Sequence, residues 1–262
     1  MPISTLVAAP PSSAASATVV VALIRDQGAE TLWLSGRGVD RTIDAVNVEF
    51  AARAFARPIP VEHRDRLGRE TRSWLTLPVG LPIGEVKGVV VNLYPGSVSN
   101  DAHIDPRVLL YGIRGPLLAA AGYAVLSPAM PESADDPAAG EGYVASVDLA
   151  VDAALKAVPD LPGERIAILG HSFGGTAALA VAARTHRYRS YVVWSAVTDL
   201  YGAWGEFDPV SRAVPEEGLS LQAQMGWVES GQGETGGSPS RARDRFEAGS
   251  PYLQAQDIRS PV

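Results

Sequence analysis

Residues 165–180 join a short apolar strand to an alanine-rich helix through one tight turn. We expect the strand at residues 165–169 and the helix to begin near Thr176, and the residues between them include GHSFG at 170–174. A serine in a turn of the form G-x-S-x-G is held in a strained conformation that exposes its hydroxyl at the edge of a sheet. With 26 glycines in the chain the pattern alone is weak, but a strand before it and a helix after it make Ser172 a candidate nucleophile.

Strands and helices alternate along much of the chain. Such alternation predicts a mostly parallel sheet that is covered by helices on both faces. A Gly/Ser-rich stretch at 230–240, within an insertion at 203–249, is typical of a mobile loop. The expected strands are residues 86–94, 123–127, 165–169 and 188–196, and the expected helices are residues 105–122, 143–158 and 173–186.

Two β-hairpins are expected ahead of this alternating region. The first pairs residues 17–24 with 31–35, and the second pairs 61–63 with 69–77. A lone hairpin is marginally stable in water, so we expect the first to belong to a larger sheet that is mostly missing. The sequence Arg-Pro-Ile-Pro at 57–60 marks the change between units, which predicts one unit at 1–57 and a second at 58–262.

The composition excludes several classes of function. A net charge of −7 argues against nucleic-acid binding, which needs a basic face. The chain has no cysteine, which rules out disulfides, thiolate metal sites and cysteine nucleophiles, and its longest apolar run, 18–24, is too short to span a membrane. Asp101, His103 and Asp105 alternate as metal ligands can, but capping and solvation of a loop explain them better. We expect no cofactor, no metal, no nucleic acid and no membrane partner, and no pattern indicates a compartment or an oligomeric state.

Three segments resemble the prolyl oligopeptidase family of serine peptidases, which have the α/β-hydrolase fold, and especially its dipeptidyl-peptidase and acylaminoacyl-peptidase branches. RIAILGHSFGG at 165–175 is similar to the family's strand and serine turn, AAAGYAVL at 119–126 to a helix end and the next strand, and VVNLYPG at 90–96 to a strand that ends in Tyr-x-Gly. Members carry a β-propeller ahead of the hydrolase domain. The resemblance therefore implies that the hairpin at 17–35 is the remnant of a last propeller blade.

The resemblance also implies roles for individual residues. Ser172 would form an acyl-serine intermediate, and the oxyanion hole would combine the Tyr94 hydroxyl with the backbone N–H of Phe173. A tyrosine that only packs at a strand end is the alternative for Tyr94. The side chain of Phe173 would line an apolar pocket for the P1 residue of a peptide substrate, although apolar residues in such places often belong to the core. The other pocket residues would be Val197, Leu200, Tyr201 and Trp204.

The acid and base of a catalytic triad are not evident in the sequence. In this fold they follow the serine in the order acid, then histidine. His186 lies 14 residues after Ser172, which is about 21 Å along a helix, and His171 points away from the neighbouring hydroxyl. Asp199 follows a strand, but the family's acid follows the next one, which we expect to begin at Pro261. We therefore expect the chain to be truncated, with the acid and histidine beyond Val262.

Three functions fit these observations. The first is a serine peptidase that hydrolyses short peptides through Ser172. The second is an esterase, because the fold and the serine turn do not distinguish amides from esters. The third is an inactive fragment or pseudoenzyme that acts as a binding module, because the chain holds no complete triad.

Overall fold

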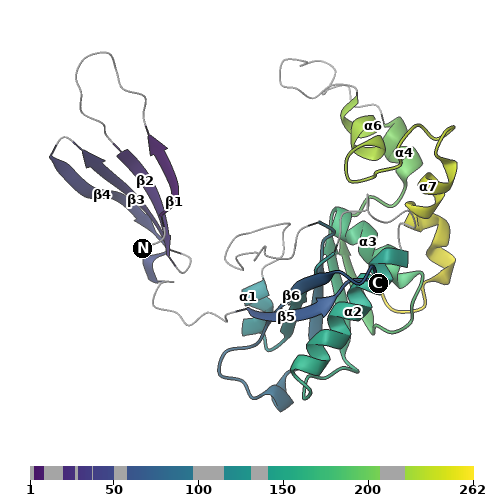
Figure 1. Cartoon of the computed structure of the whole chain (residues 1–262), viewed down its shortest axis with the longest axis horizontal. Helices are drawn as coiled ribbons and strands as arrows, with labels where there is room; N and C mark the ends of the chain where they lie inside the picture. The colour runs from purple at the N-terminus through teal and green to yellow at the C-terminus, as the bar shows by residue number, and fades with distance from the viewer. Residues whose placement is uncertain are drawn as a thin grey trace. The chain divides into compact units, whose positions relative to one another are not determined.

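The computed structural model describes residues 3–8, 20–26, 29–36, 38–49, 58–96, 115–130, 141–206 and 222–262 (Figure 1). The chain divides into two compact units, Met1–Phe55 and Ala56–Val262. The expected start of a helix at Asp105 and the residues Asp101 and His103 lie outside the described residues. None of the described helices is long and apolar enough to cross a membrane.

The first unit contains a four-stranded antiparallel sheet in the order β1-β2-β3-β4. Its strands are β1 (Ile3–Ala8), β2 (Val20–Asp26), β3 (Ala29–Gly36) and β4 (Val39–Val46). The hairpin expected from the sequence is present as β2 and β3, which pair from Val20–Ser35 to Asp26–Ala29. Two further strands, β1 and β4, flank this hairpin, so the sequence analysis recovered half of the sheet. Every side chain of β4 is exposed, which explains why no buried face was visible in its sequence.

The second unit is built on a six-stranded sheet in the order β10-β9-β7-β8-β6-β5. The four strands β10, β9, β7 and β8 are parallel, and β6 and β5 are antiparallel additions at one side. The expected second hairpin and the four expected buried strands are all present. Their bounds are β5 (Ile59–Arg64), β6 (Glu70–Thr76), β7 (Val89–Leu93), β8 (Ala124–Ser127), β9 (Ile166–His171) and β10 (Ser190–Trp194).

Helices cover the sheet because its strands are apolar on both faces. Side chains alternate between the two faces along a strand. Val91 of β7 packs in the main apolar cluster with residues of α2 (Glu141–Ala157) and α3 (Phe173–Ala182). Val125 of the neighbouring strand β8 lies instead against α1 (Gly115–Ala120). Val91 is fully buried, and burying such a side chain contributes about 1.5–3 kcal/mol. α2 and α3 match expected helices, with α3 ending four residues early, and α1 matches the described part of the helix expected at 105–122.

The segment after β10 forms a small helical region. It contains α4 (Leu200–Gly205), α6 (Gln222–Glu229), α7 (Arg243–Ala248) and the 3₁₀-helix η5 (Pro251–Asp257). The Gly/Ser-rich stretch after α6, expected as an irregular loop, is a series of hydrogen-bonded turns: the N–H groups of Gly233 and Thr235 donate to the carbonyls of Trp227 and Val228 at 3.0 Å. The expected loop is thus present, and its backbone is hydrogen-bonded to α6.

The turn between β9 and α3 brings three backbones into direct contact. A Cβ atom on Gly170 would lie 2.1 Å from the carbonyl oxygen of Gly174. A Cβ atom on Gly174 would lie 2.2 Å from the carbonyl oxygen of Leu93, at the end of β7. Real Cβ atoms do not approach backbone atoms this closely, so only glycine allows α3 to start against the sheet.

We predict that Gly170→Ala destabilises the second unit by about 2–3 kcal/mol, because the backbone must move to admit the new methyl group. The measurement is the midpoint of urea unfolding. Gly226→Ala is the matched control, since nothing lies within 4 Å of its Cβ position in α6. We expect that control to be neutral or to stabilise by up to about 1 kcal/mol. Equal effects of the two substitutions would contradict the close-approach argument.

Polar contacts of Ser73 connect the β5–β6 hairpin to the rest of the second unit. Nε2 of His63 lies 2.8 Å from Oγ of the fully buried Ser73, and this oxygen accepts a hydrogen bond from the Ala129 N–H at 2.9 Å. Nδ1 of His63 lies 3.2 Å from the Arg64 carbonyl, which can only accept. Nδ1 therefore carries a proton, and burial of the ring favours the neutral imidazole, in which Nε2 accepts from the serine.

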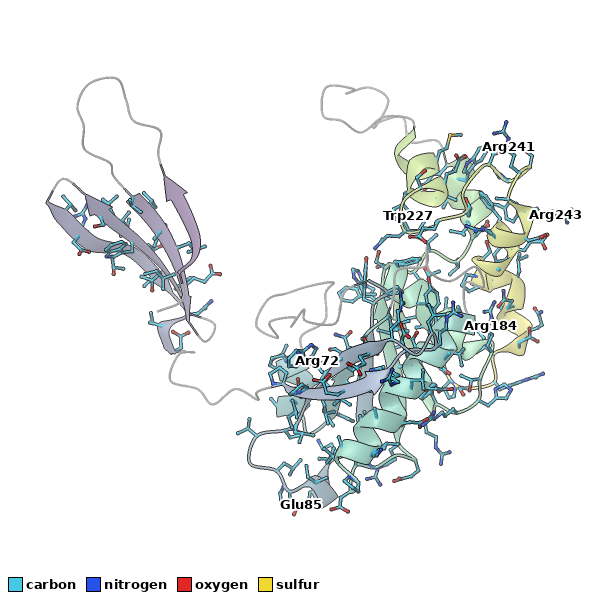
Figure 2. All side chains as sticks on the ribbon, in the orientation of Figure 1. Arg72, Glu85, Arg184, Trp227, Arg241 and Arg243 are labelled. Carbon is cyan, nitrogen blue, oxygen red and sulfur yellow. The ribbon has the colours of Figure 1, made fainter. Side chains whose placement is uncertain are left out.

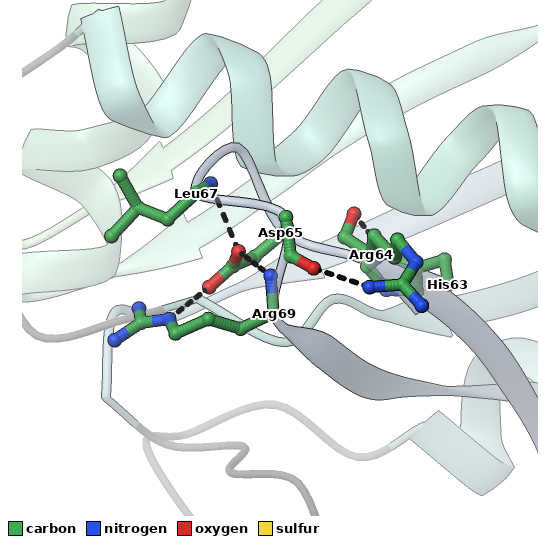
Figure 3. A network of polar contacts seen from close by, with 6 residues as sticks. His63, Arg64, Asp65, Leu67 and Arg69 are labelled. Atoms are coloured by element: carbon green, nitrogen blue, oxygen red, sulfur yellow. Dashed lines mark hydrogen bonds and ion pairs between the residues drawn. The ribbon is translucent and has the colours of Figure 1, made fainter.

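Beside this contact, the hairpin turn is organised by one carboxylate (Figure 3). Oδ1 of Asp65 accepts from the N–H groups of Leu67 and Arg69 at 2.9 and 2.8 Å, and Oδ2 accepts from Nε of Arg69 at 2.6 Å.

Burial lowers the pKa of His63, while the carboxylates of Asp65 and Glu62 act in the opposite direction. The folded state thus favours the neutral imidazole.

We predict that the folded second unit loses stability as the pH falls from about 6.5 toward the lowered pKa of His63. Over that window the unfolded chain binds a proton that the folded chain does not, and below the lowered pKa this loss is complete. The measurement is the free energy of unfolding against pH for the wild type and His63→Gln, whose difference isolates this group. His186→Gln, at an exposed histidine, is the control. An unchanged pH profile in His63→Gln would refute the neutral assignment.

Candidate active site

Three parallel strands end side by side at one edge of the sheet. The last pairs in their registers are Leu93 of β7 with Gly170 of β9, and Trp194 of β10 with His171 of β9. Tyr94 follows β7 by one residue and Ser172 follows β9 by one residue, so the sheet brings both to the same edge. The two strands β7 and β9 are direct neighbours in the sheet.

Ser172 occupies the sharp turn predicted from the sequence. Its backbone has φ 54° and ψ −124°, a conformation that non-glycine residues rarely adopt. Its N–H donates to the Trp194 carbonyl at 2.8 Å, and its carbonyl accepts from the N–H of Gly175 and Thr176 at 2.9 and 3.1 Å. These bonds hold the strained residue between the central sheet and the first turn of α3, whose N–H groups favour negative charge.

Tyr94 packs directly against this turn. Its side chain is 9% exposed, and its Cδ2 atom would lie 3.1 Å from a Cβ atom on Gly174. Its hydroxyl contacts the side-chain amide of Gln232, with Nε2 at 3.2 Å and Oε1 at 3.5 Å. The structure therefore brings Tyr94 beside the residues that follow Ser172.

Aromatic rings surround Phe173. Its side chain is 7% exposed and meets the ring of Tyr143 on α2 edge-on, with the centroids 6.4 Å apart. On α6, the ring of Trp227 also packs edge-on against Phe173, at 6.0 Å (Figure 2 labels Trp227). Edge-to-face pairs of this kind contribute about 0.5–1.5 kcal/mol beyond the area that they bury.

The other residues expected in an apolar pocket share a separate cluster. Val197, Tyr201 and Trp204 pack around Leu200, which is 2% exposed and lies in the interior of this cluster with Val228 and Phe246. The ring of Tyr201 packs at a tilt against that of Phe246, with the centroids 4.9 Å apart, and Nε1 of Trp204 donates to Oε1 of Glu229 at 2.7 Å. Phe173 belongs to the main cluster instead, and Trp227 packs against both clusters. The pocket itself stays a prediction.

The described histidines lie away from the Ser172 hydroxyl. His186 follows the far end of α3, a helix of 10 residues and thus about 15 Å long. His63 is on β5, four strands from β9, or about 19 Å across the sheet. The ring of His171 packs on that of Trp194, with the centroids 4.9 Å apart. Asp199 caps α4 by accepting from the Tyr201 N–H at 2.9 Å. The described residues thus supply no evident triad acid or base.

Two side chains at the site were missed by the sequence analysis. Gln232 and Trp227 come from the inserted region, and Gln232 is 138 positions from Tyr94 in the sequence. The Gly/Ser-rich composition around Gln232 predicted only a loop. No sequence signal paired this glutamine with a tyrosine at the end of a distant strand.

Comparisons with known proteins identify the fold. The sequence matches no protein-family model, and it matches no curated protein. Solved structures do match: acylaminoacyl peptidase of Pyrococcus horikoshii has a TM-score of 0.64 at 14% identity, over 95% of this chain and 38% of that one. Dipeptidyl peptidase 4 of Porphyromonas gingivalis gives 0.59 at 15% identity, over 92% of this chain and 33% of that one.

A puromycin-hydrolyzing peptidase of Mycobacterium tuberculosis has a TM-score of 0.59 at 17% identity, over 93% of this chain and 36% of that one. The chain therefore spans little more than a third of the length of these structures. Its mostly parallel sheet, extended by β6 and β5, fits their α/β-hydrolase fold. The resemblance expected from the sequence is thus confirmed: this chain has the fold of the serine peptidases of the prolyl oligopeptidase family.

Proposed function

We propose that this chain carries the nucleophile and the oxyanion hole of a serine peptidase. The observation that carries the proposal is the strained backbone of Ser172, at φ 54°, between the end of a central strand and the start of a helix. Such strain persists where the surrounding structure over-determines it, and it clusters at active sites. In this role the turn at residues 170–174 is a nucleophile elbow.

In the proposed reaction, Oγ of Ser172 attacks the carbonyl carbon of a peptide. The carbonyl oxygen becomes an oxyanion, which accepts hydrogen bonds from the backbone N–H of Phe173 and the hydroxyl of Tyr94. The C–N bond then breaks, the amine leaves with a proton, and an acyl-serine remains. Water hydrolyses this ester to release the acid and restore the serine.

Two observations favour peptides over simple esters. The solved structures that match the fold are named as peptidases. In addition, the first unit is a four-stranded antiparallel sheet, which is the form of one blade of a β-propeller. We propose that this sheet is such a blade, as in the family that the sequence resembles. An esterase on the same fold is the second candidate.

We further propose that the triad acid and histidine come from outside the described residues. A general base must lie within about 3 Å of the proton that it removes. His63 and His186 are both far from Ser172 along the sheet and the helix, and the His171 ring packs on Trp194. If no base reaches the serine, the chain is an inactive binding module, which is the third candidate.

We predict that a fluorophosphonate labels the chain only at Ser172, and slowly as long as no base reaches this serine. The serine oxygen forms a bond to phosphorus, the P–F bond breaks, fluoride leaves and the hydroxyl proton passes to water. The oxyanion hole alone retains about 10³-fold catalysis over water, whereas loss of the base costs about 10⁶-fold in kcat. Peptide turnover should therefore fall far below the usual range of about 1–10³ s⁻¹.

The control for this experiment is another strained serine at the same edge of the sheet. Ser195 follows β10 with φ 51°, so Ser195→Ala is matched in chemistry and backbone to Ser172→Ala. Labelling should disappear in Ser172→Ala and persist in Ser195→Ala. Labelling that survives Ser172→Ala would remove Ser172 from the mechanism. Peptide cleavage at ordinary enzyme rates would show that a base within the 262 residues does reach Ser172, and faster turnover of esters than of amides would favour the esterase.

We predict that Tyr94→Phe lowers the rate constant of phosphonylation at Ser172 by about 10²-fold, the scale for losing one oxyanion-hole donor. The phenyl ring keeps the contact with Gly174 and removes only the hydroxyl. Tyr252→Phe, at an exposed tyrosine of η5, is the control and should leave the rate unchanged. An unchanged rate in Tyr94→Phe would leave Tyr94 as a packing residue.

A further inference from the structure

Gln232 links Tyr94 to Trp227 beside the serine turn. Its Nε2 atom lies 3.2 Å from the Tyr94 hydroxyl, and its Oε1 atom lies 3.3 Å from Nε1 of Trp227. The Tyr94 hydroxyl is also 3.5 Å from Oε1, which is longer than the contact with Nε2. One side-chain amide therefore contacts a phenol on one side and an indole on the other.

The indole determines how this amide is oriented. The Nε1–H of Trp227 can only donate a hydrogen bond, so it needs the oxygen of the amide. Turning the amide over would direct its NH₂ group against the indole N–H, which leaves both donors unsatisfied. Oε1 of Gln232 therefore faces Trp227, and Nε2 faces Tyr94.

The backbone around Gln232 keeps the amide in place. The N–H of Gly233 donates to the Trp227 carbonyl at 3.0 Å, and the N–H of Gly231 donates to the Gly226 carbonyl at 2.9 Å. A Cβ atom on Gly233 would lie 2.7 Å from Cα and from the carbonyl oxygen of Val228, so the turn sits directly on α6. The ring of Trp227 is held in turn by its edge-to-face contact with Phe173.

The direction of the hydrogen bond matters for the proposed chemistry. If Nε2 of Gln232 donates to the phenol oxygen, the proton of the Tyr94 hydroxyl is not used in that contact. A hydroxyl that accepts one hydrogen bond becomes a better donor in the next, because hydrogen bonds in a chain polarise one another. The proton of Tyr94 can then be donated to an oxyanion formed at Ser172.

We propose that Gln232 is a positioning residue, oriented by Trp227, that makes the Tyr94 hydroxyl a hydrogen-bond donor to the oxyanion. This inference rests on the proposed function, because it takes Tyr94 as part of the oxyanion hole. Gln232 itself touches no reacting atom and acts through Tyr94. The inserted region between β10 and η5 thus contributes to the site through α6 and the turn that follows it.

The first test is Gln232→Glu, which has nearly the same shape. A carboxylate only accepts hydrogen bonds, so it satisfies Trp227 but draws the Tyr94 proton toward itself. The rate constant of phosphonylation at Ser172 should fall by about 10-fold or more, toward the value of Tyr94→Phe. The loss should diminish at a pH low enough to protonate the glutamate, which can then donate to the phenol. Gln232→Leu, which removes both polar atoms, should cause a smaller loss that is independent of pH.

The decisive test repeats Gln232→Glu in the Tyr94→Phe background. If Gln232 acts through the Tyr94 hydroxyl, the second substitution has no further effect once that hydroxyl is gone. If Gln232 only stabilises the fold, the two losses multiply, which would overturn the proposal. Gln256→Glu, at an exposed glutamine of η5, is the matched control and should leave the rate unchanged.

Two further outcomes separate the inference from the proposed function. If Ser172 is never labelled in the wild type, the proposed function fails, and the inference fails with it. If Tyr94→Phe lowers the rate but Gln232→Glu does not, only the role of Gln232 is overturned. If Gln232→Glu fails to fold, Trp227→Phe replaces it, because it keeps a ring against Phe173 and removes the indole N–H. It should lower the rate in the wild type and have no further effect in Tyr94→Phe, and additive losses would again refute the proposal.

Discussion

The close contact between the start of α3 and the end of β7 determines the arrangement of the whole site. The Cα of Gly174 lies so near the Leu93 carbonyl that no larger residue fits. Because of this contact, α3 begins directly over the central strands, and Ser172 is left in a left-handed conformation between them. The same contact places the ring of Tyr94 against the turn, so one backbone approach positions both side chains. The strain at Ser172 is sustained by packing on both sides of the turn, where burial of residues such as Leu93 and Ala178 outweighs its cost of about 1–3 kcal/mol.

The helical region after β10 adds Trp227 and Gln232 to the site at the edge of the sheet. Trp227 packs against the main apolar cluster through Phe173 and against the smaller cluster around Leu200. It therefore connects the helical region to the serine turn by apolar packing and to Tyr94 through the amide of Gln232. Any movement of α6 relative to the sheet would change the environment of the Tyr94 hydroxyl. In this arrangement the donor strength of the tyrosine depends on how well the helical region is packed.

Sequence and structure agree where the signal is local. The second unit has strands of buried apolar residues that alternate with helices, and the expected strands overlap the strands of the structure. Ser172 was proposed from a local motif and Tyr94 from the family resemblance, and both follow parallel strands that end at a common edge. The prediction missed β4, because an exposed strand with polar and apolar residues on both faces has no buried side to give it a period. For residues 230–240 the composition indicated a loop but not its path, because the hydrogen bonds that define its turns are made with the carbonyls of α6.

The hydrogen-bond direction at Gln232 shows why such a residue cannot be inferred from sequence. A glutamine amide is symmetric in shape, and its function depends on which end faces the tyrosine. Here that choice is made by Trp227, five residues earlier in the chain, whose indole can only donate. The indole is in turn located by Phe173, the residue after the candidate nucleophile. The chain of contacts therefore starts and ends at the serine turn: Phe173 fixes Trp227, Trp227 orients Gln232, and Gln232 directs the hydroxyl of Tyr94. A local change at any of these positions would act on the same proton, which is why coupling between substitutions, rather than the size of any single effect, distinguishes a positioning role from a structural one.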